Sequence, residues 1–215
     1  LGVPLFTVSC HDDLTAADGT VYYYVVSAVN AQGESANSAE VSCTPAPFPW
    51  SNADIGSVGL SGSCTVDDGG AFTTAGSGAG IGTTADSFNF TYKPMTGDGT
   101  VIARVSSVAN PLMSKVGVIM CEDLGTAPKA ACVLYDSHSS FLQARMFTRT
   151  TAGSGATWIN STVLGLPTWL KLTRAGNVFT GYASTSGTSW TQISTITIPM
   201  APTIYVGLEN TSRNT

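Results

Sequence analysis

Short runs of alternating apolar and polar residues, separated by glycine-rich turns, recur along most of the chain. No segment shows the 3.6-residue period of an amphipathic helix. Many short strands with turns between them are typical of a β-sandwich or barrel, so the sequence predicts an all-β protein. The runs lie at 71–73, 87–92, 101–108, 115–120, 130–135, 141–147, 169–174, 178–184, 191–198 and 204–208.

Glycine-containing turns join several of these runs. Residues 96–100, 174–178 and 186–188 each place glycine between two alternating runs, which predicts hairpins and antiparallel meanders. Phe88, Phe90 and Tyr92 alternate within one run, and we expect them to fill the layer between two sheets.

Residues 20–45 have a different organisation. Residues 22–30 alternate as in a strand with one buried face, Gln32-Gly33 is a turn signal, and 39–43 alternates again before Pro45. The spacing Tyr-x-Tyr-x-Val-x-Ala-x-Asn-x-x-Gly-x-Ser resembles the last two strands of a fibronectin type III module. The resemblance implies that 1–45 is the C-terminal half of such an immunoglobulin-like sandwich. Residues 46–50 would be a stiff proline-rich linker.

The remainder, 51–215, carries a second ordered series of motifs. It resembles the concanavalin A-like jelly-roll domains of bacterial secreted or surface proteins, a group with laminin-G-like members. The resemblance implies an antiparallel β-sandwich. The motifs are WSNADIG at 50–56, DSFNFTY at 86–92, GDG at 97–99, ARV at 103–105, KVGVIM at 115–120, WLKLTR at 169–174, GTSWT at 187–191 and YVGL at 205–208.

The two segments that carry these resemblances are each shorter than the complete domain. A fibronectin module has seven strands, and the jelly roll usually has one more strand after 207–212. We therefore expect that the sequence is part of a longer multidomain chain. Alternatively, a neighbouring copy supplies the missing strands by β-strand addition, with self-association through residues 1–45.

Charge is sparse and mostly negative. Charged residues make up 11% of the chain, the net charge is −5 and the pI is about 4.7. Nucleic acids and anionic membrane surfaces need clustered Lys and Arg, so neither is expected as a partner. No apolar stretch approaches the ~20 residues that span a bilayer, so no membrane insertion is expected. The abundance of Gly, Ser and Thr favours an extracellular or cell-surface location.

Five cysteines occur without a C-x-x-C pair, which argues against a zinc site. Cys121 and Cys132 flank a turn-like segment and are candidates for a disulfide across a hairpin. Cys10 and Cys43 are a second candidate pair, which leaves Cys64 over. The alternative is that all five are buried free thiols.

Catalytic motifs are absent from the sequence. Glycosidases on this type of sandwich need paired carboxylates at alternate strand positions, and the spacing Glu-x-Asp-x-x-Glu does not occur. His138 lies between Ser137 and Ser139, but sequence neighbours rarely align as nucleophile and base. The sequence therefore predicts no enzymatic activity of its own.

Carboxylates in a glycine-rich turn are a candidate calcium site. Asp67 and Asp68 precede Gly69-Gly70, and calcium prefers carboxylate and loop carbonyl oxygens. A metal-free exposed turn explains the pattern equally well, so calcium is a possible cofactor and no other is expected.

A mixed polar and aromatic face is a candidate sugar site, because sugars need an aromatic platform and hydrogen-bonding groups for the hydroxyls. In the run 141–147, Phe141, Gln143, Arg145 and Phe147 share one face. Trp158 lies in a glycine-rich stretch nearby, while burial in the core is the competing explanation for each aromatic residue.

Three functions fit these observations. The first is a non-enzymatic extracellular binding or adhesion module for carbohydrate or a cell-surface glycan. The second is a structural repeat of an extracellular filament, completed by strands from a neighbouring copy. The third is an accessory module of an enzyme whose catalytic domain lies elsewhere.

Overall fold

The computed structural model describes residues 20–43, 50–67, 70–82, 84–109, 114–138 and 141–213, and of His138 and Phe141 only the backbone. All regular elements in these residues are β-strands. None of the described residues forms a helix long and apolar enough to cross a membrane. The chain divides into two compact units. The first includes residues 20–43, and the second includes Trp50–Val66 and Phe72–Thr215.

Residues 20–43 of the first unit form a two-stranded ribbon. β1 (Tyr22–Tyr24) pairs with β4 (Val41–Cys43), and β2 (Val29–Asn30) pairs with β3 (Gly33–Glu34), all antiparallel. The predicted hairpin is therefore confirmed. Among the described residues neither face of this run is fully buried: Tyr22 and Tyr24 are half-buried on one face, where Val26 is 72% exposed, and Tyr23 and Val29 are 65% and 76% exposed on the other.

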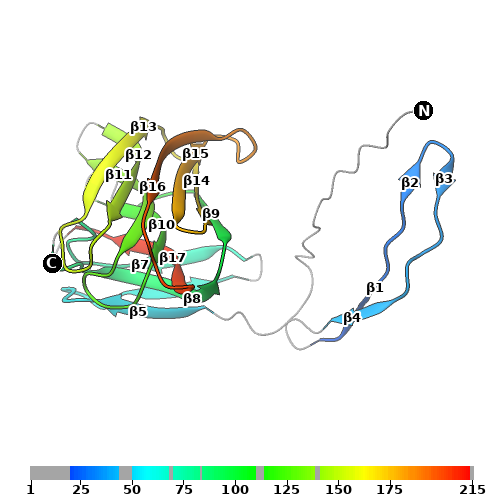
Figure 1. Ribbon diagram of the computed structural model, residues 1–215, viewed down its shortest axis with the longest axis horizontal. Coiled ribbons are helices and arrows are strands. Elements are labelled where there is room, and N and C mark those ends of the chain that lie inside the picture. Colours follow the sequence, from blue (N-terminus) through cyan, green and yellow to red (C-terminus); the bar gives the residue numbers. More distant parts are fainter. Residues whose placement is uncertain are drawn as a thin grey trace. The chain divides into compact units, whose positions relative to one another are not determined.

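The second unit is a two-layer antiparallel sandwich (Figure 1). Its larger sheet has seven strands in the order β13-β12-β11-β10-β17-β8-β5. These strands are β5 (Ser51–Ile55), β8 (Phe88–Thr96), β10 (Lys115–Cys121), β11 (Ala130–His138), β12 (Phe141–Arg149), β13 (Thr157–Val163) and β17 (Thr203–Thr211).

The smaller sheet has four strands in the order β16-β15-β14-β9, and a separate hairpin joins β6 to β7. Two predicted hairpins are confirmed here, since β14 pairs with β15 and β15 with β16. The predicted hairpin at 96–100 is wrong, because that turn links β8 of one sheet to β9 of the other. The strands are β6 (Ser63–Val66), β7 (Phe72–Ala75), β9 (Gly99–Val105), β14 (Thr168–Ala175), β15 (Val178–Ser184) and β16 (Thr191–Thr197).

The main core lies between the two sheets. Val118 and Met120 of β10 pack in one cluster with Leu170 and Leu172 of β14 and Phe179 of β15. Their alternation along each strand is what directs them to one side, as the sequence pattern predicted. Burying each such side chain contributes roughly 1.5–3 kcal/mol of transfer free energy, so this layer holds the sandwich together.

A second apolar cluster lies on the outer face, which we define as the face of the seven-stranded sheet turned away from the four-stranded one. Phe88 and Phe90 belong to this cluster with Ile119, Leu134 and Phe147. Tyr92 packs against the same cluster, so the expectation that Phe88, Phe90 and Tyr92 fill the inter-sheet layer is wrong. The apolar residues of this sheet occupy both faces, because loops cover the outer one.

One covering loop, residues 76–82 and 84–87, is called the strap below. Its Ile81 is 1% exposed and packs in the outer cluster. The strap is closed by a bridge from Gly80 N–H to the Ser87 carbonyl at 2.7 Å. The Thr211 hydroxyl of β17 donates to the Gly78 carbonyl at 2.6 Å, so the strap is fixed to the sheet beneath it.

The cysteines correct the predicted disulfides. Cys121 and Cys132 are buried free thiols. In the register of β10 and β11, Cys121 lies opposite Ala130 and Cys132 opposite Ile119, so the two cysteines are diagonal neighbours. Diagonal Cα atoms lie about 7–8 Å apart, beyond the usual reach of a disulfide. Burial raises the pKa of both thiols, which makes them unreactive.

Two further described cysteines, Cys43 and Cys64, are not paired with each other either. Cys43 is exposed and Cys64 half-buried, both with free thiols. Cys10 lies outside the described residues, so its predicted pairing with Cys43 concerns a residue whose position is not described.

Candidate functional site

Two rows of residues cross the outer face beside the strap, set by the strand register. The first runs Thr211, Lys115, Asp136, Gln143 across β17, β10, β11 and β12. The second runs Glu209, Gly117, Leu134, Arg145. Because adjacent strands place paired side chains about 5 Å apart, these rows bring together polar groups that are distant in sequence.

Asp136 holds the side chains at the more exposed end of these two rows in place. Its side chain is 1% exposed and accepts hydrogen bonds from two arginines. Arg145 Nη1 donates to Oδ2 at 3.1 Å, and Arg213 Nη1 donates to Oδ1 at 3.3 Å. Arg145 Nε also donates to Gln143 Oε1 at 3.1 Å. The carboxylate therefore holds two guanidinium groups side by side, with 22% and 28% of their side-chain surfaces exposed.

Trp158 of the edge strand β13 completes the group. The guanidinium carbon of Arg145 lies 4.8 Å from the centre of the Trp158 ring, a cation–π contact. Trp158 remains 53% exposed, which is unusual for so large an apolar side chain. The arginine fixes the ring while leaving about half of the residue open to solvent.

Hydrogen-bonding capacity remains on both arginines. Within the described residues, neither Nη2 of Arg145 nor Nε and Nη2 of Arg213 has a partner. Arg213 also adopts a φ of 59°, the left-handed region that non-glycine residues rarely occupy. Its amide donates to the Thr211 hydroxyl at 3.2 Å, which helps to hold this turn.

A buried ion pair lies beneath the strap. Arg149 is 0% exposed and its Nη1 and Nη2 donate to the two oxygens of Asp86 at 2.6 and 2.5 Å. Arg149 also donates to the carbonyls of Ser154 and Pro128 at 2.6 and 3.1 Å. Burial raises the pKa of Asp86, and the hydrogen bonds from Arg149 oppose that rise. This bidentate pair fastens the strap to the outer face of β12.

Glu209 lies in the same covered region, 1% exposed. Neither of its carboxyl oxygens has a hydrogen-bond partner among the described residues. Burial raises its pKa to about 8, although Lys115 nearby opposes the rise. Lys115 itself donates to the Ile81 carbonyl at 3.0 Å and lies over the Phe147 ring. Glu209 therefore keeps its proton at neutral pH.

The structure brings together three of the predicted sugar-binding residues, Gln143, Arg145 and Trp158. The backbone of Phe141 pairs with His138 in the β11–β12 hairpin, and its side chain is not described. Phe147, expected on the same face, is 6% exposed and belongs to the outer cluster. Whether these residues bind a ligand stays a prediction.

Sequence reasoning missed Asp136 and Arg213. The contact between Asp136 and Arg145 could have been predicted, because the two residues are nine positions apart on the two strands of a short hairpin. Arg213 is 77 residues from Asp136, and only the position of β17 beside β10 brings them together.

The predicted calcium residues lie in the turn between β6 and β7. Asp67 Oδ1 accepts from the Ala71 amide at 2.8 Å, as in a turn that needs no metal. Asp68 lies outside the described residues. In the part of the chain that is described, no three His, Cys, Asp or Glu side chains gather as metal ligands. Calcium at this turn stays a prediction.

Comparisons with known proteins show the fold. No family model and no curated protein matches the chain. The second unit is similar to a functionally unknown protein from Saccharomyces cerevisiae, with 15% identity, a TM-score of 0.59, and 76% of this chain and 88% of that one covered.

Two further solved structures are more distant. The exoplasmic/lumenal domain of VIP36, bound to Ca²⁺ and Man3GlcNAc, has 10% identity, a TM-score of 0.48, and coverage of 77% and 78%. The carbohydrate binding module CBM66 from Bacillus subtilis has 15% identity, a TM-score of 0.48, and coverage of 76% and 88%. Nothing in these comparisons supports the fibronectin type III resemblance. The predicted all-β, antiparallel two-sheet sandwich is confirmed.

Proposed function

We propose that the second unit is a non-catalytic carbohydrate-binding module that works outside the cell, with Trp158, Arg145, Gln143 and Arg213 as its binding residues. The observation that supports it most is the half-exposed Trp158 ring fixed by Arg145, which in turn is held by the buried Asp136. A rigid aromatic platform next to hydrogen-bonding groups is what a sugar ring requires. The extracellular location rests on the composition alone.

The charge of this group favours an acidic saccharide. Two arginines share one carboxylate, so the group has an excess positive charge in a chain whose net charge is −5. The guanidinium nitrogens without partners can donate to a carboxylate or sulfate, for which arginine is the matching donor. A uronate or sialate would pair with these nitrogens while its ring contacts Trp158.

The placement of the carboxylates supports a non-catalytic role. Asp136 is occupied by two arginines, Asp86 of the strap is paired with Arg149 and 2% exposed, and Glu209 lies beneath the strap at 1% exposure. Glu209 keeps a proton at neutral pH, as a general acid must, but a substrate cannot reach it through the strap. A glycosidase needs both carboxyl groups at the sugar.

Glycan binding tests the proposal. We expect uronate- or sialate-containing oligosaccharides to bind in titration calorimetry, and their carboxyl-reduced counterparts to bind at least about tenfold more weakly. Trp158→Ala should weaken both by about tenfold or more, since it removes the platform. Arg213→Gln should lower only the affinity for the acidic forms.

The matched control is Trp190→Ala, which removes a tryptophan that contacts Lys171 on the other sheet. It should leave glycan binding unchanged. Absence of binding to every acidic and neutral glycan on an array would contradict the proposed function as a whole.

The exposed ribbon favours a second candidate, the structural subunit of an extracellular filament. Val26 and Val29 are about three-quarters exposed although they lie in a strand-forming pattern. Apolar side chains exposed on a two-stranded ribbon favour association with another chain. Among the described strands, β1 pairs with β4 and β2 pairs with β3, and a strand from another chain can add to such a two-stranded ribbon.

Sedimentation velocity tests this second candidate. The chain should form oligomers that dissociate in the Val26→Lys and Val29→Lys double variant, because charges on the ribbon oppose association. A monomer at all concentrations up to the millimolar range would exclude it.

A further inference from the structure

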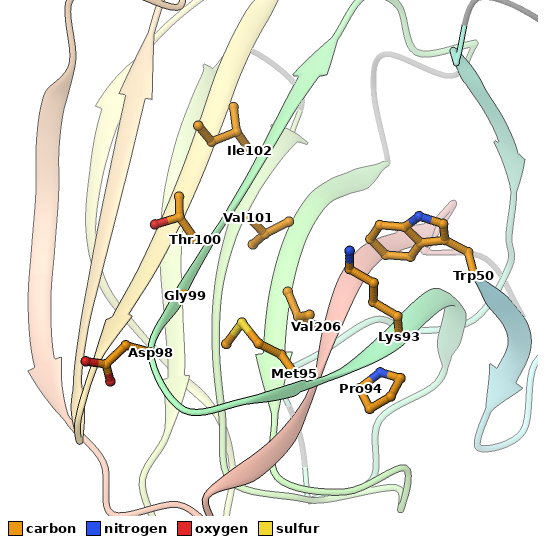
Figure 2. A pocket seen from close by; sticks show the side chains of 10 residues that line it. All are labelled: Trp50, Lys93, Pro94, Met95, Asp98, Gly99, Thr100, Val101, Ile102 and Val206. Carbon is orange, nitrogen blue, oxygen red and sulfur yellow. The ribbon is translucent and has the colours of Figure 1, made fainter. Parts of the chain in front are cut away.

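A groove opens between the two sheets at the side where β8 and β9 separate (Figure 2). Its volume is about 480 Å³, within the range of ligand sites in proteins. It belongs to the second unit and does not include the outer-face residues described above. It is lined by Trp50, Lys93, Pro94, Met95, Asp98, Gly99, Thr100, Val101, Ile102 and Val206.

The groove follows the free edge of β9. β9 is the last strand of the four-stranded sheet, and β14 is its only partner among the described strands. Residues 98–102 line the groove one after another. Successive side chains of a strand point to opposite faces, so a groove on one face of the sheet would be lined by every second residue. Consecutive residues line a groove only where it runs along the edge of the strand. The unpaired backbone amides and carbonyls of β9 therefore face the groove.

The floor is apolar. Val101 and Val206 are 8% and 3% exposed and belong to the main core, and Met95 packs against the same cluster. Figure 2 shows Val206 and Met95 between the β8 and β9 sides of the groove. An apolar side chain that enters the groove would extend the sandwich core at a place that none of the described strands covers.

One wall carries a positive charge without an acidic partner. Lys93 Nζ lies 5.1 Å from the centre of the Trp50 ring, and no carboxylate in the described residues pairs with it. The Trp50 ring is braced edge-on against Phe72 at 5.7 Å. Asp98 is already engaged, because its Oδ1 accepts from the Gly176 amide at 2.6 Å, and it points away from the groove in Figure 2.

We propose that this groove binds an extended peptide segment that adds to the free edge of β9 as a fifth strand. The proposed partner is an extended segment in which β-branched residues alternate with polar ones. Its β-branched side chains would lie on the apolar floor, and an acidic residue would pair with Lys93. The backbone edge supplies affinity, and the floor and the lysine supply specificity, as in other cases of β-strand addition.

Two synthetic hexapeptides test the proposal, acetyl-Asp-Thr-Val-Thr-Val-Thr-amide and acetyl-Thr-Val-Thr-Val-Thr-Asp-amide, which place the acid at either end. Added to the isotope-labelled full chain, one of them should shift the backbone amide signals of residues 93, 95–102 and 206, with a Kd of about 0.1–1 mM. N-methylation of alternate amides is the decisive control. One methylated peptide carries the methyl groups on its odd-numbered amides and the other on its even-numbered amides. Only one of the two should lose binding, because alternate amides of a strand point toward its neighbour.

Two lysine variants separate the groove from general charge effects. Lys93→Met should weaken the Asp peptide about three- to tenfold, to the affinity of its Asn counterpart. Lys171→Met removes a lysine that also lies over aromatic rings, Tyr182 and Trp190, and should change nothing. The proposal is overturned if neither peptide shifts these signals at 5 mM, if both methylated forms bind equally, or if butyrate alone reproduces the shifts.

Discussion

Arg149→Met is expected to lower the free energy of unfolding by about 3–5 kcal/mol at pH 7, because it leaves the buried carboxylate of Asp86 without its counter-charge. Asp86 is 2% exposed, and both its oxygens accept from Arg149. Urea unfolding followed by circular dichroism measures the change. The loss should shrink as the pH falls, since Asp86 can then take up a proton whose binding burial already favours.

The double variant Asp86→Asn with Arg149→Met is the matched control. It removes both charges and should recover a large part of the lost stability, because no isolated charge remains buried. A single variant as stable as the wild type, or a double variant less stable than the single one, would show that the pair does not fasten the strap.

Glu209→Gln is expected to abolish a decline in stability between about pH 4.5 and pH 8. The folded-state pKa of Glu209 is raised to about 8 from an unfolded value of 4.5, so the folded state binds the proton more tightly. Its stabilising contribution is complete below pH 4.5 and is lost as the pH rises through 8. A shift of this size corresponds to on the order of 5 kcal/mol.

The measurement is the difference in unfolding free energy between Glu209→Gln and wild type at pH 4.5 and 8.5. The unfolding free energy of the variant minus that of the wild type should increase by several kcal/mol from pH 4.5 to pH 8.5. Glu122→Gln, at a partly exposed glutamate paired with Lys129, is the matched control for the effect of a glutamate substitution on stability. Parallel pH profiles for Glu209→Gln and wild type would show that Glu209 is not a buried neutral acid.

The sequence predicted the strands whose alternation is regular and whose ends are marked by turns. Residues 115–120, 130–135 and 141–147 became β10, β11 and β12 for this reason. β13 was missed, because its residues Thr157–Val163 mix polar and apolar side chains on both faces and are mostly exposed at the edge of the sheet. Such a strand carries no alternation for a sequence pattern to detect.

Pairing between distant strands could not be predicted. The insertion of β17 between β10 and β8 brings Arg213 to Asp136 and Glu209 beneath the strap. Nothing local in the sequence specifies that order. The disulfide prediction failed for a related reason, since two cysteines that flank a turn can face each other only in one register, and the hairpin adopts another.

Part of the binding group was predictable because it is local. Gln143 and Arg145 share a face by the period of a strand, and Trp158 follows on the next strand. The second arginine and the buried carboxylate that orders both guanidinium groups came only from the tertiary structure. These two residues change the expected ligand from any sugar to an acidic one.

The most direct test of the carbohydrate-binding account is the position of a bound acidic oligosaccharide, mapped by NMR on the isotope-labelled full chain. The account predicts that the indole N–H signal of Trp158 and the Nε–H signals of Arg145 and Arg213 shift together with a single affinity. A saccharide that binds while all three signals stay in place, or that shifts only residues of the β8–β9 groove, would contradict it.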